Sequence, residues 1–135
     1  MSMRAATVVL VEDDPDLQFL TTLMLTQAGY VVRSYGDARE AVPACIDNPP
    51  DAVVLDWMLP GMTGLEALRE LRAHPATAHL PVVMATACDL PQNVAAAMES
   101  GAHGYLVKPF SLDDLLREVG AAIESRLAPV AVGAA

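Results

Sequence analysis

The chain has 135 residues, of which 53% are hydrophobic, and this length suits one domain with an ordinary core while leaving no room for a second folded domain. The formal net charge of −9, with the arginines scattered along the chain, argues against direct nucleic-acid binding, which needs clustered Lys and Arg. Because we find no membrane-spanning stretch and no leader pattern, we expect a cytoplasmic protein that makes no contact with a membrane.

Five apolar, strand-like runs alternate with helical patterns along the chain, over residues 6–11, 30–34, 52–55, 81–85 and 104–107. Short apolar runs between helical segments are typical of buried strands in a parallel sheet. Right-handed crossovers between such strands place helices on both faces of the sheet. The sequence therefore predicts an α/β fold with a five-stranded parallel sheet, in one domain over residues 1–128 that is followed by a disordered C-terminal tail over residues 129–135.

Three of the predicted helices carry start signals. Asp14 precedes a proline at an expected first helical position, and Thr63 with Glu66 has the pattern of a capping box. Ser111 opens an acidic variant of the same box. We expect the second helix to be short or kinked, because Pro43 falls inside it and removes a backbone hydrogen bond.

The last predicted helix carries a stripe of apolar residues. They recur at helical spacing along one side: Leu112, Leu115, Leu116, Val119 and Ile123. A stripe of this kind is typical of a helix that packs on a sheet, so we expect all five side chains to belong to the core.

Four of the apolar runs end at polar residues that can bind a phosphoryl group or a divalent cation. The first run ends at Glu12 and Asp13, the third at Asp56, the fourth at Thr86 and the fifth at Lys108, which is the only lysine of the chain. Open parallel sheets bind ligands just beyond the carboxyl ends of their strands. We therefore expect three acids, a hydroxyl and an amine to meet at one edge of the sheet.

This set of groups suits phosphoryl chemistry. Three converging carboxylates repel one another, and a divalent cation relieves the repulsion while keeping them ionised. Oxygen-only ligation favours Mg²⁺, with Mn²⁺ as the alternative, over zinc. A carboxylate beside such a cation can act as a nucleophile toward phosphorus, and Asp56 is the predicted nucleophile. Glu12 and Asp13 would hold the metal, while Lys108 and Thr86 would contact the phosphoryl oxygens.

Four segments carry a resemblance to a known family, over residues 9–15, 54–64, 83–87 and 104–110. They read Val-Leu-Val-Glu-Asp-Asp-Pro, Val-Leu-Asp-Trp-Met-Leu-Pro-Gly-Met-Thr-Gly, Val-Met-Ala-Thr-Ala and Gly-Tyr-Leu-Val-Lys-Pro-Phe. With these motifs, the chain resembles the receiver domain of two-component response regulators, and the resemblance covers residues 7–127. It is similar to the single-domain regulators of chemotaxis. The resemblance implies a flavodoxin-like (βα)5 fold with strand order 2-1-3-4-5.

The resemblance also implies a role for each site residue. Asp56 matches the phosphoacceptor, and Glu12 and Asp13 match the acid pair. Met58 matches the position whose backbone carbonyl is a metal ligand, and Lys108 matches the amine that contacts the phosphoryl group. The family pattern further implies a cis peptide bond between Lys108 and the proline that follows it.

A switch and a set of partners follow from the same resemblance. Phosphorylation would draw the Thr86 hydroxyl toward Asp56, and Tyr105 would turn into the space that Thr86 leaves. The implied donor is a phosphohistidine on a sensor histidine kinase or on a histidine phosphotransfer protein of a phosphorelay. An unknown downstream protein would bind, after phosphorylation, to the fourth helix, fifth strand and fifth helix, over residues 92–100, 104–107 and 111–123. The protein is then a phosphoacceptor in signal transduction and not an enzyme beyond its own phosphorylation and dephosphorylation.

Other interpretations remain open. A haloacid-dehalogenase-like phosphatase uses a similar set of groups, but it normally has a second aspartate where this chain has Met58, and it needs length for a cap domain. A receiver that serves only as a docking module, without phosphorylation, is a further alternative. Taken alone, Asp56 could be a turn or helix-cap residue and Thr86 an ordinary strand residue. The sequence also leaves open a phosphorylation-dependent dimer, and whether the chain is a full-length regulator or part of a longer one.

Overall fold

The computed structural model describes residues 4–87 and 90–127, so the predicted tail over residues 129–135 lies outside the described residues. Strands and helices alternate through the described part of the chain. Their bounds are β1 (Thr7–Val11), α1 (Pro15–Gln27), β2 (Val31–Tyr35), α2 (Ala38–Asp47), β3 (Ala52–Asp56), α3 (Gly64–Ala73), β4 (Val82–Thr86), α4 (Pro91–Glu99), β5 (Gly104–Val107) and α5 (Leu112–Leu127). Within these ranges, none of the helices combines the length and the hydropathy needed to cross a bilayer.

The five strands form one parallel sheet in the order β2-β1-β3-β4-β5, as predicted. The strand bounds differ from the expected ones by a residue at several ends. The most relevant difference is that β3 and β4 extend to include Asp56 and Thr86, which pair in register with Ala85 and Val107 on the neighbouring strands. These two polar side chains are thus held by the sheet itself and not by the loops after it.

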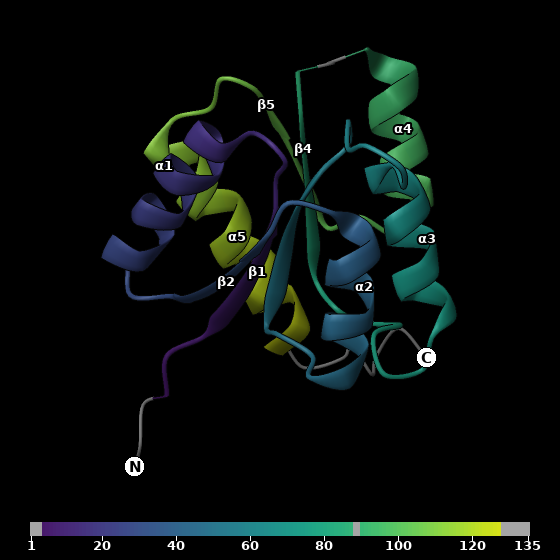
Figure 1. Cartoon of the computed structure of the whole chain (residues 1–135), viewed down its shortest axis with the longest axis horizontal. Helices are drawn as coiled ribbons and strands as arrows, with labels where there is room; N and C mark the ends of the chain where they lie inside the picture. Colours follow the sequence, from purple (N-terminus) through teal and green to yellow (C-terminus); the bar gives the residue numbers. More distant parts are fainter. Residues whose placement is uncertain (1–3, 88–89, 128–135) are drawn as a thin grey trace, which may run out of the picture.

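Helices cover both faces of the sheet (Figure 1). Helices α2, α3 and α4 pack on one face, over a core that includes Val9, Val53 and Met84. Helices α1 and α5 pack on the other face, where Val8, Val54 and further alternate strand residues lie. The central strands β3 and β4 are buried along their whole length. Alternation of side chains between the two faces explains why these strands read as continuous apolar runs.

The predicted helix starts are confirmed. The Asp14 carboxylate caps α1 by accepting hydrogen bonds from the backbone amides of Asp16 and Leu17. Thr63 and Glu66 form the reciprocal capping box of α3. A further cap is present at α5, where the hydroxyl of Ser111 accepts the N–H of residue 114 at 3.0 Å. These caps bind backbone donors that the first turns of the helices leave unpaired.

The second helix continues through Pro43 to Asp47, and the proline ring lies on its exposed side. For the last helix, one prediction was wrong: Leu112 is 43% exposed, whereas Leu115 and Val119 are fully buried. Leu112 is the first residue of α5 and does not belong to the core cluster that contains Leu115 and Val119. Helical spacing places a residue on the correct side of a helix, but it does not show where the sheet beneath that helix ends.

Candidate functional site

The site lies at the carboxyl edge of the sheet, where the chain leaves β1, β3 and β5. Glu12 directly follows β1, Asp56 is the last residue of β3, and Lys108 directly follows β5. The sheet hydrogen bonding continues into these residues. The Glu12 N–H donates to the Tyr35 carbonyl at 3.0 Å, and the Lys108 N–H donates to the Thr86 carbonyl at 2.8 Å. The backbone at each strand end is therefore fixed before its side chain enters the site.

Three acidic side chains converge at this edge. Glu12, Asp13 and Asp56 each offer a carboxylate oxygen, and these oxygens lie within 4.8 Å of one another. Glu12 and Asp56 are each 5% exposed, while Asp13 is open to solvent. Like charges at this separation repel one another, most strongly where burial removes the screening by water. The cluster therefore favours a positively charged partner.

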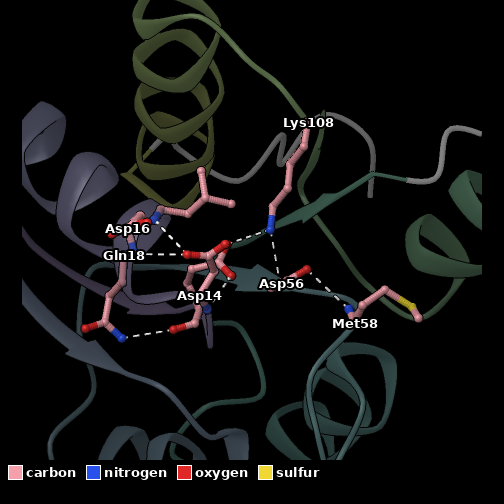
Figure 2. A network of polar contacts seen from close by, with 8 residues as sticks. Asp14, Asp16, Gln18, Asp56, Met58 and Lys108 are labelled. Atoms are coloured by element: carbon pink, nitrogen blue, oxygen red, sulfur yellow. Dashed lines mark hydrogen bonds and ion pairs between the residues drawn. The ribbon is translucent and has the colours of Figure 1, made fainter.

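Lys108 supplies one positive charge to the cluster (Figure 2). Its Nζ donates to Glu12 Oε1 at 2.5 Å and lies 3.2 Å from Asp56 Oδ2. Although burial alone acts to lower it, the pKa of this ammonium is raised by the hydrogen bond to Glu12 and by the charge of Asp56. The amine therefore stays protonated and bridges the two buried acids. The Lys108–Pro109 peptide bond is cis, as predicted.

The pKa of Asp56 is higher than is usual for an aspartate. Burial, and after it the charge of Glu12, raise its pKa to about 6, against the opposing effects of Lys108 and of a hydrogen bond from the Met58 amide. That amide donates to Asp56 Oδ1 at 3.2 Å. The two carboxylate oxygens of Asp56 thus face different partners, with Oδ1 toward the β3–α3 loop and Oδ2 toward Lys108.

The loop after β1 is held by contacts that sequence reasoning did not identify. Glu12 Oε2 accepts the N–H of Asp14 at 3.1 Å, and the backbone carbonyl of Glu12 accepts Gln18 Nε2 at 2.9 Å (Figure 2). Gln18 is the fourth residue of α1, and no motif in the sequence marked it. Helix α1 thereby contacts the acid pair at two points, through its cap residue and through Gln18.

The loop after β3 folds closely over Asp56. Gly64, the first residue of α3, donates its N–H to the Trp57 carbonyl at 2.8 Å. A Cβ atom at this glycine would lie only 2.2 Å from the Asp56 carbonyl oxygen and 2.7 Å from the Trp57 Cα. Only glycine allows the start of α3 to approach the end of β3 so closely. The side chain of Met58, in the same loop, is exposed.

Thr86 lies on β4, the strand next to that of Asp56, and Tyr105 lies on β5, one strand further from Asp56. Thr86 is the last residue of β4 and is 1% exposed. Tyr105, on β5, is half-buried and packs against the core on the α2–α3–α4 face, with Met84 as its register partner. Because side chains alternate along a strand, Thr86 is on the same face of the sheet as Met84, which is also the face of Tyr105.

The donor set determines which ligand fits. The three carboxylates carry three negative charges and Lys108 carries one positive charge, so the cluster keeps two uncompensated negative charges when all groups are ionised. All the side-chain ligands are oxygens, and hard divalent cations such as Mg²⁺ are bound through oxygen. Glu12, Asp13 and Asp56 therefore fit a divalent cation in both charge and donor type. Such a cation would neutralise the oxygens of a phosphoryl group beside Asp56.

Comparison with known proteins points to the same family as the sequence motifs. Residues 8–120 match the family model described as the response regulator receiver domain. The phosphate regulon transcriptional regulatory protein PhoB of Pseudomonas aeruginosa is 32% identical over 97% of this chain, and the match covers 59% of PhoB. The chain thus spans little more than half the length of that relative.

Solved structures of similar proteins share the fold. The chemotaxis protein CheY4 of Vibrio cholerae is 29% identical, with a TM-score of 0.84 over 88% of this chain and 99% of that one. The receiver domain of a sensor histidine kinase from Pseudomonas aeruginosa is 31% identical, with a TM-score of 0.83 over 90% of this chain and 99% of the other, and its structure has a magnesium ion coordinated in the active-site cleft. Together with the family match, the strand order and the acidic edge, these likenesses lead to one conclusion: the chain belongs to the response regulator receiver domain family.

Proposed function

We propose that the chain accepts a phosphoryl group on Asp56 in a Mg²⁺-dependent reaction, from a phosphohistidine on a sensor histidine kinase or a histidine phosphotransfer protein. One observation carries the proposal. Asp56 is a buried carboxylate that lies 3.2 Å from the only lysine and within 4.8 Å of two further acids, at the carboxyl edge of a parallel sheet. This arrangement can hold both a nucleophile and the charges that stabilise a phosphoryl group.

Each group has a defined part in the reaction. A carboxylate oxygen of Asp56 bonds to phosphorus while the bond between phosphorus and the donor imidazole nitrogen breaks. Lys108 is already within reach of Asp56 and pairs with the incoming phosphoryl oxygens. Glu12, Asp13, Asp56 and the backbone carbonyl of Met58 hold Mg²⁺, for which Mn²⁺ is a substitute. When bound, the cation neutralises the charge that gathers on the phosphoryl oxygens.

Signalling follows from the change of charge at Asp56. Phosphorylation adds nearly two negative charges and three acceptor oxygens, which draw the Thr86 hydroxyl and Lys108 inward. Tyr105, half-buried on the neighbouring strand, then moves into the space near Thr86. The rearrangement links the site to the surface of α4, β5 and α5.

Exposed apolar side chains on that surface support a role in protein binding. Leu90, Met98, Val107 and Leu112 are each 39–49% exposed, and they lie on or beside α4, β5 and α5. Apolar side chains exposed on a small domain are typical of surfaces that bind other proteins when they lie together. A downstream protein, or a second phosphorylated copy, binds this face in the phosphorylated state, and the protein acts in the cytoplasm as a signalling domain over residues 1–128.

Intact-mass measurement after incubation with Mg²⁺ and acetyl phosphate tests the proposal. We expect a single phosphoryl adduct that hydroxylamine removes, that EDTA prevents and that Asp56→Asn lacks. Asp47→Asn is the matched control, because Asp47 is an exposed aspartate at the end of α2, and this variant keeps the adduct.

Fluorescence of Trp57, the only tryptophan, shows whether the folded site binds the metal, because this half-buried residue directly follows Asp56. The phosphoacceptor role is supported if Asp56→Asn forms no phosphoryl adduct while the Trp57 fluorescence of the Asp47→Asn control responds to Mg²⁺ as that of the wild type does. The proposal is contradicted if the wild-type Trp57 fluorescence responds to Mg²⁺ but the protein forms no phosphoryl adduct with acetyl phosphate or with a phosphohistidine donor. That result favours a docking module that works without phosphorylation.

A further inference from the structure

A second group of polar side chains lies at the opposite, amino edge of the sheet. Thr7 and Val31 are the first residues of β1 and β2, and Asp51 directly precedes β3. Asp56, at the other end of β3, is five residues further along an extended strand, which corresponds to about 17 Å. This amino edge is therefore separate from the site described above.

A cavity of about 350 Å³ is present at this edge. We call it the arginine cavity, and it is lined by Arg4, Ala5, Thr7, Val31, Arg33, Asn48, Pro49 and Asp51. An adjoining cavity of about 280 Å³ shares Arg4 and Asp51 with it and adds Arg126 from α5. Three of the seven arginines of the chain thus gather around these two hollows.

The charges around the arginine cavity do not cancel. Asp51 Oδ2 accepts the N–H of Thr7 at 2.7 Å, and Asp51 Oδ1 lies 3.9 Å from Arg126. Arg126 therefore compensates the one acid that lines the cavity. Over residues 4–87 and 90–127, no carboxylate lies within 4.0 Å of the guanidinium of Arg4 or of Arg33. In a chain with 17 acidic and 8 basic residues, two arginines without an acidic partner in one cavity form a local excess of positive charge.

Arg33 also has donor capacity to spare. Its Nη2 donates to the Asn48 carbonyl at 2.7 Å, at the end of α2. Its Nε is buried and has no hydrogen-bond partner among the described residues. Because Nε is closed to solvent, a bound oxyanion would pair with the outer Nη groups, and an oxyanion is the partner that a guanidinium group prefers.

We propose that the arginine cavity binds a small organic or inorganic oxyanion, whose phosphate or carboxylate group is held by Arg4 and Arg33. The apolar lining from Ala5, Val31 and Pro49 accepts a short carbon portion of such a molecule. The size of the cavity suits a compact, metabolite-sized anion. The proposal does not depend on phosphorylation at Asp56, because the two sites lie at opposite edges of the sheet.

Amide-resolved NMR of the full chain, without Mg²⁺ and at low salt, tests this site with two probes, inorganic phosphate and malonate. We expect saturable shifts at the amides of Ala5, Thr7, Val31 and Asn48, with the Lys108 amide unchanged. The probe that binds more tightly identifies the class of oxyanion. Arg33→Gln and Arg4→Gln should each weaken that binding at least about tenfold, which is the effect of losing a charge-assisted hydrogen bond.

Arg69→Gln is the matched control, because Arg69 is an exposed arginine of α3 outside the cavity, and it should bind as the wild type does. If Arg33→Gln fails to fold, Arg4→Gln still decides the question, because the Arg4 side chain is exposed. Two results would overturn the proposal. One is the absence of saturable shifts at the cavity with either probe, and the other is wild-type affinity in Arg4→Gln.

Discussion

At the scale of single residues, Gly64 shows how closely the β3–α3 loop is packed on Asp56. In Gly64→Ala, the new Cβ would lie 2.2 Å from the Asp56 carbonyl oxygen, so the end of β3 or the start of α3 must shift. We expect a loss of about 1–3 kcal/mol in the free energy of unfolding, measured by urea denaturation. Gly120→Ala is the control, because a Cβ at this position of α5 meets no atom within 4 Å, and it should stabilise the helix by up to about 1 kcal/mol. Equal stability of Gly64→Ala and the wild type would contradict the close packing.

Met58 is the second residue whose effect can be isolated. Its amide donates to Asp56, while its apolar side chain is exposed beside the site and can shield an acyl phosphate from water. We expect Met58→Asn to shorten the lifetime of the phosphorylated protein several-fold, because the amide side chain can bind and orient a water molecule near phosphorus. The decay of the intact-mass adduct measures this lifetime. Met98→Asn, at an exposed methionine of α4, should leave the lifetime unchanged, and an unchanged lifetime in Met58→Asn would count against shielding.

At the scale of elements, Arg72 joins α3 to the segment between α4 and β5. Its Nη2 donates a hydrogen bond to the Gly101 carbonyl at 2.7 Å, and the same atom lies 3.4 Å from His103 Nδ1. His103 Nδ1 also accepts the N–H of Val82 at 3.3 Å, which requires this nitrogen to be unprotonated. Burial, and after it the charge of Arg72, lower the pKa of His103 from its ordinary value of 6.5. The unfolded chain therefore binds this proton more readily than the folded one, so the free energy of unfolding should fall as the pH falls below 6.5. Urea denaturation at several pH values should show a smaller fall in His103→Gln, and the same fall in both proteins would exclude His103 as the cause.

At the scale of the whole molecule, the acidic edge should link metal binding to stability. The three carboxylates, whose oxygens lie within 4.8 Å of one another, repel each other. A cation that binds only the folded state stabilises that state by about 2.7 kcal/mol when its free concentration is a hundred times its dissociation constant. We expect Mg²⁺ to raise the thermal midpoint and EDTA to reverse the change. Asp13→Asn should raise the midpoint without metal, because it removes one repelling charge, and should reduce the gain with Mg²⁺. A gain from Mg²⁺ as large in Asp13→Asn as in the wild type would exclude Asp13 as a ligand.

Much of this fold was readable from local patterns. Apolar runs bounded by helical segments located all five strands to within one residue at every end, and the cap residues Asp14 and Thr63 located the helix starts. These features depend on neighbours only a few residues apart, which the sequence shows directly. The exposure of Leu112 was not readable in this way, because it depends on where the sheet beneath α5 ends.

The sequence by itself determined the α/β class, the order of the motifs and the polar residues that end the strands. Only the tertiary structure decided the contacts between distant parts of the chain. Lys108 and Glu12 form an ion pair across 96 residues of sequence, and Gln18 reaches the backbone of the acid pair without any motif to mark it. The arginine cavity likewise joins Arg4 and Arg33 through the pairing of β1 with β2. The physical reason is that local patterns specify the elements, whereas the register and packing of those elements specify which side chains meet.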